Sequence, residues 1–149
     1  MKYKTTDEMA HFDFHGSVIA DMRTCSGLFI MILDNVKILP ENSCNRDIRT
    51  MRTNQLEFRI REAVIERLTE EGYQVYDADG RLTRREEDKQ VSPALFAETF
   101  GELRGCCIYA IDKKDDKYEI SIDTEDHTYL LRVTGSGDTQ EWERFMSMT

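Results

Sequence analysis

The chain has 149 residues, of which 40% are hydrophobic and 33% are charged, and this composition is typical of a single folded domain over residues 1–149 rather than of a disordered segment. Its formal net charge is −9, and an acidic surface repels phosphate groups, which disfavours nucleic acids and anionic membranes as partners. No apolar stretch is long enough to cross a membrane and no signal peptide is evident, so a cytoplasmic protein is expected.

The first third of the chain is predicted to form strands. Ala10, Phe12 and Phe14 alternate with polar residues, which is the period of a half-buried strand. A second strand is predicted over residues 17–24. The continuous apolar run over residues 28–33 predicts a third strand, buried on both faces.

Residues 54–72 fit two kinds of element. As a helix, the segment would begin at Asn54 and end at Gly72, with apolar residues spaced by four. As a strand, its apolar and charged residues alternate over residues 56–61. The local pattern alone slightly favours the helix, and an α+β fold with a helix at about residues 54–71 is therefore an alternative.

A hairpin and a helix are predicted next. Residues 73–76 read as a strand that ends in a tight turn at residues 77–80. Ser92 followed by Pro93 is a favourable helix start, so a helix is predicted over residues 92–104.

The region 106–134 predicts a β-meander of three strands with one solvated face. Cys107, Tyr109 and Ile111 alternate on one side of its first strand, and the next two strands show the same period. The four cysteines of the chain include no CxxC pair, which predicts free thiols rather than disulfides or a zinc site.

The last segment is predicted to be a short helix, because Asp138 and Glu141 can form a capping box ahead of Trp142. Taken together, these elements predict a mainly β fold, an antiparallel sandwich or partly open barrel with one or two short helices.

Three phrases of the sequence carry a resemblance to a known family. They are HFDFHGSVIADM, EGYQVYDADGRL and YEISIDTEDHTYLLRV followed by EWERF. Together they resemble a family of small acidic uncharacterised proteins of unknown function from Gram-positive anaerobic bacteria. The opening is also similar to small β-rich proteins of the immunity or accessory type. The resemblance implies strand at residues 56–68, with a bulge near Glu62 and Ala63, and it implies no activity, catalytic residue or cofactor.

His11, Asp13 and His15 are the candidate metal ligands. Alternate positions on a strand face the same side, and two imidazoles with a carboxylate suit iron, zinc or manganese. Alternate residues lie about 7 Å apart along a strand, so the three converge on one ion only where the strand bends. A further ligand, His127 or Asp126, would have to come from elsewhere. The simpler interpretation is the solvated polar face of an edge strand.

The sequence therefore favours a non-enzymatic cytoplasmic binding or accessory protein of the immunity type, because no reactive set of side chains converges in it. A protein partner, basic in charge, or a homodimer is expected, and no cofactor. Two alternatives stay open. One is a small metal-dependent enzyme that uses His11, Asp13 and His15, and the other is a carrier with an enclosed apolar cavity for a small ligand.

Overall fold

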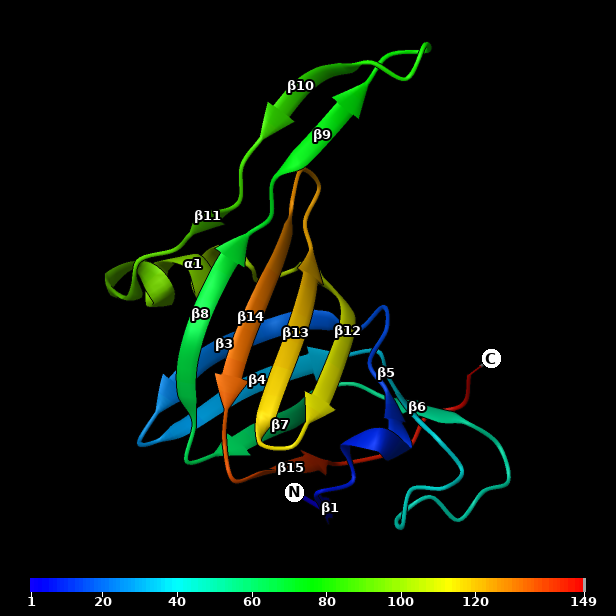
Figure 1. The fold of residues 1–149 in the computed structure, drawn as a ribbon. Coiled ribbons are helices and arrows are strands. Elements are labelled where there is room, and N and C mark those ends of the chain that lie inside the picture. The colour runs from blue at the N-terminus through cyan, green and yellow to red at the C-terminus, as the bar shows by residue number, and fades with distance from the viewer. Residues whose placement is uncertain (149) are drawn as a thin grey trace.

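One continuous antiparallel sheet of ten strands makes up most of the fold in a computed structural model of the chain, which describes residues 1–148 (Figure 1). In chain order, its strands are β1 (Tyr3–Thr6), β3 (Val18–Cys25), β4 (Leu28–Asp34), β7 (Leu56–Arg61), β8 (Val64–Glu70), β11 (Lys89–Gln90), β12 (Cys107–Lys114), β13 (Lys117–Asp123), β14 (Thr128–Thr134) and β15 (Gly137–Trp142). They lie side by side in the order β1-β15-β7-β4-β3-β12-β13-β14-β8-β11. The predicted mainly β, antiparallel fold is confirmed.

Two smaller sheets and three short helical elements lie around the ten-stranded sheet. A three-stranded sheet lies beside one end of it, and a two-stranded hairpin projects from the other (Figure 1). The three-stranded sheet contains β2 (Phe12–Asp13), β5 (Val36–Ile38) and β6 (Met51–Thr53). The hairpin contains β9 (Tyr73–Tyr76) and β10 (Leu82–Glu86). The helical elements are η1 (Met9–His11), η2 (Pro93–Leu95) and α1 (Phe96–Glu102), and α1 packs against β3. No helix within residues 1–148 is long and apolar enough to span a membrane.

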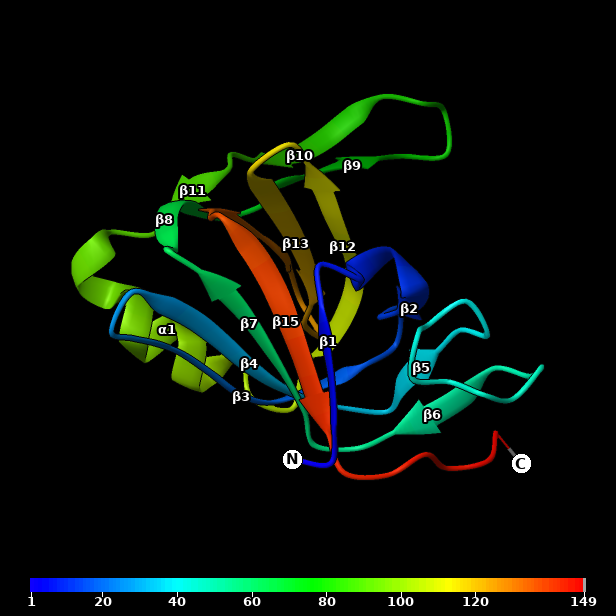
Figure 2. The same cartoon turned by 90° about the horizontal axis from the view of Figure 1, so that it is seen from below.

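The ten-stranded sheet folds over on itself into two layers. Strands β8, β14, β13 and β12 form one layer, and β15, β7, β4 and β3 run across them in the other (Figures 1 and 2). The chain changes layer at two corners, residues 62–63 between β7 and β8, and residues 135–136 between β14 and β15. At the second corner only glycine fits, because a Cβ on Gly135 would lie 2.3 Å from Ile60 Cγ2. The terminal strands β1 and β11 do not pair with each other, so the sheet stays open.

The core fills the space between the two layers. Its largest fully buried side chains are Trp142, Tyr118, Phe29, Phe58, Ile19, Met31, Leu33, Ile38, Leu56, Ile60, Leu68 and Leu103. These residues come from both layers, from β5 and from the end of the α1 segment. Alternation in the strands therefore buries one face of each layer, which is how a sheet folded across itself is stabilised.

The alternative helix at residues 54–71 is wrong, and the strand that the resemblance implies is confirmed. Leu56, Phe58 and Ile60 are all fully buried, and β7 pairs with β4 on one side and β15 on the other. Residues 62–63 are a corner between layers rather than a bulge within one strand. Pairing on both edges of β7 overrides the weak helical spacing, because local propensity yields to long-range burial.

The predicted C-terminal helix is also wrong. Residues 137–142 form β15, which pairs with β1 and β7. Asp138 does not cap a helix, since its side chain is fully buried and serves as an acceptor inside the fold. The predicted helix at 92–104 is shorter than expected, and Ser92 makes no side-chain capping bond.

Candidate functional site

An open cleft of about 700 Å³ lies between strand β12 and the segment that forms η1 and β2. In Figures 1 and 2 these two segments lie side by side although they are about a hundred residues apart in the chain. The charged and polar side chains around the cleft are Asp7, Asp13, His15, Asp112, Lys113 and Asp138. The rest of its lining is mainly apolar, and four of the six charged or polar side chains are aspartates.

A β-bulge shapes the first wall of the cleft. The register of β12 against β13 shifts between Ile108 and Ala110, which adds one residue to β12. Ile108 faces the core and Tyr109 is exposed, whereas Ile111 packs against the core again. The prediction that Cys107, Tyr109 and Ile111 share one side is therefore wrong, because the bulge reverses the alternation between them.

The same bulge turns Lys113 inward. Its ammonium lies 5.3 Å from the centre of the Tyr118 ring and 3.5 Å from Asp138 Oδ2. Simple alternation would have placed Lys113 on the same side as Cys107 and Tyr109. Because of the bulge, Lys113 instead reaches the buried carboxylate of Asp138 at the edge of the cleft.

Within residues 1–148, strand β12 has one edge that pairs with no strand along most of its length. On one side it pairs with β13 from Cys107 to Lys114, but on the other it meets β3 only through the partners Cys107 and Val18. The last backbone bonds on this side join Ile108 to the turn before β3. Beyond them, His15 Nδ1 lies 2.9 Å from the carbonyl oxygen of Tyr109, and residues 110–113 border the cleft.

Asp7 holds the second wall in place. Its backbone N–H donates to the carbonyl oxygen of Asp138 at 2.8 Å, and its carboxylate accepts from the N–H of Asp138 at 2.9 Å. The same carboxylate pairs with Arg61 Nη2 at 3.2 Å. The hydrogen bond from the Asp138 backbone, followed by the Arg61 charge, holds the pKa of Asp7 below its usual value against the effect of burial.

Glu8 anchors the same wall to the loop after β5. Its carboxylate accepts from the backbone N–H of Ser43 at 2.9 Å and from the Ser43 hydroxyl, and it lies 3.1 Å from His11 Nδ1. Burial acts to raise the pKa of Glu8, but the bonds from Ser43 and His11 outweigh it and lower that pKa. Two consecutive carboxylates therefore fix the start of η1.

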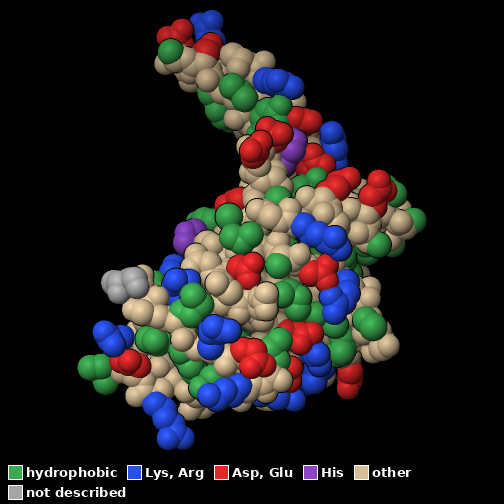
Figure 3. All heavy atoms as spheres, turned by 180° about the vertical axis from the view of Figure 1, so that it is seen from behind, with side chains coloured by type: hydrophobic (Ala, Val, Ile, Leu, Met, Phe, Trp, Pro, Cys, Tyr) green, Lys and Arg blue, Asp and Glu red, His purple; other side chains and the backbone are tan. Residues whose placement is uncertain are grey.

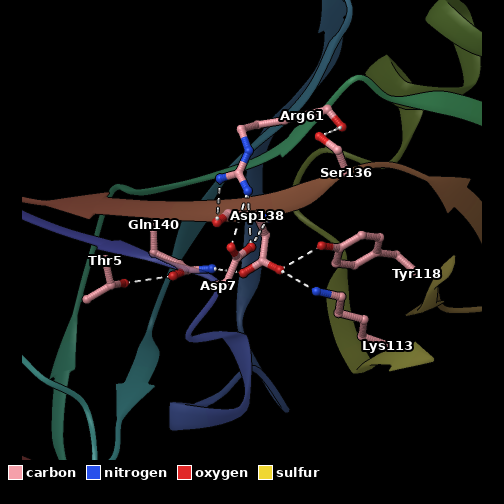
Figure 4. A network of polar contacts seen from close by, with 8 residues as sticks. All are labelled: Thr5, Asp7, Arg61, Lys113, Tyr118, Ser136, Asp138 and Gln140. Carbon is pink, nitrogen blue, oxygen red and sulfur yellow. Dashed lines mark hydrogen bonds and ion pairs between the residues drawn. The ribbon is translucent and has the colours of Figure 1, made fainter. Parts of the chain in front are cut away.

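Asp138 is the centre of a buried polar network that joins both walls (Figure 4). Its carboxylate accepts from the Tyr118 hydroxyl at 2.6 Å and from Gln140 Nε2 at 2.6 Å, while Gln140 Oε1 accepts from the Thr5 hydroxyl at 2.7 Å. Burial and the bond to Asp138 raise the pKa of Tyr118, so its hydroxyl stays a donor. Lys113 adds a positive charge from β12. Because these groups satisfy one another, the network is a structural support that joins the two walls.

The structure distributes the predicted metal ligands rather than gathering them. Asp13 and His15 line the cleft, whereas His11 ends η1 and its ring is held by Glu8. Asp13 Oδ1 accepts from the backbone N–H of His15 at 3.0 Å, and the His15 ring contacts Tyr109. Within residues 1–148, no three His, Cys, Asp or Glu side chains form a group that could hold a metal ion. A metal site at these residues therefore rests on the sequence alone.

A second candidate site is the hairpin formed by β9 and β10, residues 73–86, which we call the arm. It stands clear of the two-layered body in Figures 1 and 3, and among the described residues it pairs with no other strand. Its turn is built locally, because Asp77 Oδ1 accepts from the N–H groups of Asp79 and Arg81, each at 2.9 Å. The predicted turn at residues 77–80 is thus confirmed.

The base of the arm is acidic. Residues 70–72 and 87–90, on either side of the arm, contain four carboxylates and one basic side chain, and residues 123–128, in the turn after β13, contain three carboxylates and no Lys or Arg. Six of the nine net negative charges of the chain therefore lie at this end, where Figure 3 shows red side chains gathered below the arm. His127, predicted with Asp126 as a further metal ligand, lies here with Nε2 3.3 Å from Glu70 Oε1.

Sequence reasoning missed Lys113 and Asp138 at the cleft. The bulge in β12 leaves no pattern in the sequence, so the inward orientation of Lys113 could not be predicted. Asp138 and Gln140 do alternate in the last strand, and this pattern of two inward polar residues was available, but the capping-box interpretation took precedence over it. Comparison of the chain with protein-family models, curated proteins and solved structures found no match.

Proposed function

We propose that the chain is a non-enzymatic binding protein whose arm, together with the acidic base, engages a basic protein. The observation that carries this proposal is the arm itself. A two-stranded hairpin is at best marginally stable alone in water, and no other strand in the described part of the chain pairs with this one. Such a hairpin becomes more stable when the surface of a partner packs on it.

The arm offers apolar contacts to such a surface. Val75, Tyr76 and Leu82 are 44%, 56% and 50% exposed, and all three lie on its two strands. Covering what remains exposed of each would contribute about 1 kcal/mol, since full burial of a large apolar side chain contributes about 1.5–3 kcal/mol. Tyr76 is also the kind of rigid aromatic residue that dominates binding energy at interfaces.

The negative charge around the arm favours a partner with a positively charged surface. The acidic base attracts a basic surface, raises the association rate and repels nucleic acid. An acidic cytoplasmic protein with a basic protein partner is also what the resemblance to immunity-type proteins implies. Binding of this kind requires no cofactor and no reactive side chain.

Capture experiments with matched variants test the proposal. The chain and its variants are immobilised, exposed to a lysate of the organism that encodes them, and the retained proteins are identified by mass spectrometry. We expect the chain to retain a basic protein, and the double variant Tyr76→Ala, Leu82→Ala to lose it. The control is Val64→Ala, because Val64 is 61% exposed on β8, outside the arm.

Two results would count against the proposal. One is retention of the same basic protein by the chain and by the double arm variant, which would place the binding surface elsewhere. The other is the retention of acidic proteins alone. The folding of each variant is checked first by its amide spectrum, so that loss of binding is not confused with loss of structure.

A further inference from the structure

The geometry of the cleft points to a second binding activity, which we propose is the capture of an extended polypeptide segment that adds to the free edge of β12 and places a basic side chain opposite Asp112. The cleft and the arm are built from different residues. The inference therefore stands whether or not the arm binds a basic protein.

The free edge of β12 determines the kind of occupant. Residues 110–114 continue the ladder with β13, but no strand within residues 1–148 pairs with their other side, where residues 110–113 line the cleft. A strand edge presents alternating backbone N–H and C=O groups, and only another extended backbone matches their spacing along its whole length. A cleft of about 700 Å³ leaves room for such a segment.

The cleft is preformed, which lowers the cost of binding. Asp7 and Glu8 fix the start of its second wall through backbone bonds to Asp138 and Ser43. The buried Asp138 network ties that wall to Lys113 on β12. A segment that enters therefore finds both walls in position, and only the segment itself has to be ordered.

A row of charges across the sheet specifies the side chain opposite Asp112. In the registers of β14, β13 and β12, Arg132 lies beside Glu119 and Glu119 lies beside Asp112. Arg132 Nη2 approaches Glu119 Oε1 at 3.8 Å, so that carboxylate has a partner, whereas Asp112 forms no ion pair within residues 1–148. Asp112 thus faces a like charge across the ladder on one side and the cleft on the other. Lys114 and Lys117 line a second pocket with it but lie further along the ladder, so a Lys or Arg on an added strand would complete the row at Asp112.

The apolar lining specifies the other face of the segment. Phe12, Phe14 and Ile111 lie along the cleft, and both phenylalanines are nearly buried. Successive side chains of an extended segment point to opposite faces. The expected ligand is therefore a strand with apolar residues on the inner face and one basic residue on the outer face.

A defined peptide tests this inference without knowledge of the natural partner. The probe is the blocked heptapeptide Thr-Val-Thr-Val-Lys-Val-Thr, titrated into the full isotope-labelled chain and followed by amide chemical shifts. We expect the shifts to change at residues 110–114 and at His15. A second probe with Glu in place of Lys should bind about fivefold more weakly, because an opposite-charge pair across strands is exchanged for a like-charge pair. A third probe, N-methylated on alternate residues of the edge that pairs, should not bind.

Reversal of one charge gives the sharpest test. Asp112→Lys should invert the preference, so that the Glu probe binds more tightly than the Lys probe. If Asp112→Lys folds poorly, Asp112→Asn takes its place, and this variant should remove the preference. The matched control is Glu66→Lys on β8, which makes the same change of charge outside the cleft and should leave the preference intact.

Three outcomes of the peptide titrations would overturn the inference. They are the absence of any shift at residues 110–114, equal binding of the N-methylated probe, and an unchanged preference in Asp112→Lys. A concentration-dependent shift of the same amides without peptide would overturn it as well, since it would assign the edge to a second copy of the chain.

Discussion

Single residues hold the cleft in shape, and Gly137 is the clearest example. A Cβ on Gly137 would lie 1.9 Å from Arg61 Nη2 and 2.5 Å from Asp7 Oδ1, so only glycine leaves room for this ion pair. We expect Gly137→Ala to lower the free energy of unfolding by about 1–3 kcal/mol, the usual cost of forcing atoms into a packed site. Chemical denaturation measures this change.

The control for that prediction is Gly101→Ala in α1. A Cβ on Gly101 meets no atom within 4 Å, and alanine is favoured over glycine in a helix by about 0.5–1 kcal/mol. We expect this variant to be equal to the parent chain or slightly more stable. Equal destabilisation by the two substitutions would show that the space beside Arg61 is not what requires glycine at 137.

The carboxylates of Asp7 and Glu8 make the stability of the wall depend on pH. Both have pKa values lowered in the folded chain, from reference values of 3.8 and 4.5. A lowered pKa stabilises the folded state above the unfolded pKa, and this stabilisation is lost as the pH falls through the folded pKa. We therefore expect stability to decline below about pH 5, and Asp7→Asn to flatten that decline. An unchanged pH profile in this variant would contradict the assignment.

The histidines at residues 11 and 15 supply a further prediction. Because Glu8 holds the His11 ring away from the cleft, we expect His11→Ala and His15→Ala to leave the metal content of the purified chain unchanged. Mass spectrometry of protein without an affinity tag measures this content. Iron, zinc or manganese near one ion per chain, lost in both variants, would instead establish the metal site predicted from the sequence.

At the scale of elements, the sequence predicted strands well where apolar and polar residues alternate, as in β13 and β14. Prediction from the sequence failed where pairing with distant strands determines the secondary structure. Residues 137–142 carry a helix-capping pattern, yet pairing with β1 and β7 makes them a strand. The bulge in β12 could not be foreseen, because it depends on how β12 meets its neighbours and not on any residue type. The site residues Lys113 and Asp138 were missed for these same two reasons.

The arm is the element whose independence is simplest to test. Replacing residues 74–85 by two glycines would join Tyr73 to Glu86, which are partners in the hairpin, across a short turn. Within residues 1–148 the arm pairs with no strand of the body, so we expect the free energy of unfolding to change by less than about 1 kcal/mol. A loss of several kcal/mol would show that the arm supports the fold.

At the scale of the whole molecule, charge and shape place the two candidate surfaces apart. The acidic arm end carries six of the nine net negative charges, whereas the cleft lies beside η1 near the other end of β12 (Figure 1). Attraction between exposed charges is screened by salt over about 8–10 Å at physiological ionic strength. Binding at the arm should therefore weaken strongly with salt, and strand addition at β12, which depends mainly on backbone bonds, should weaken less.

The most direct measurement is the dissociation constant of a captured basic partner for the chain and for the chain without residues 74–85, each at low and high salt. If the arm is the binding element, its removal weakens binding by about a hundredfold or more, and salt weakens the binding of the intact chain. Equal dissociation constants for the two chains, with no dependence on salt, would contradict the account and remove the arm as the site of binding.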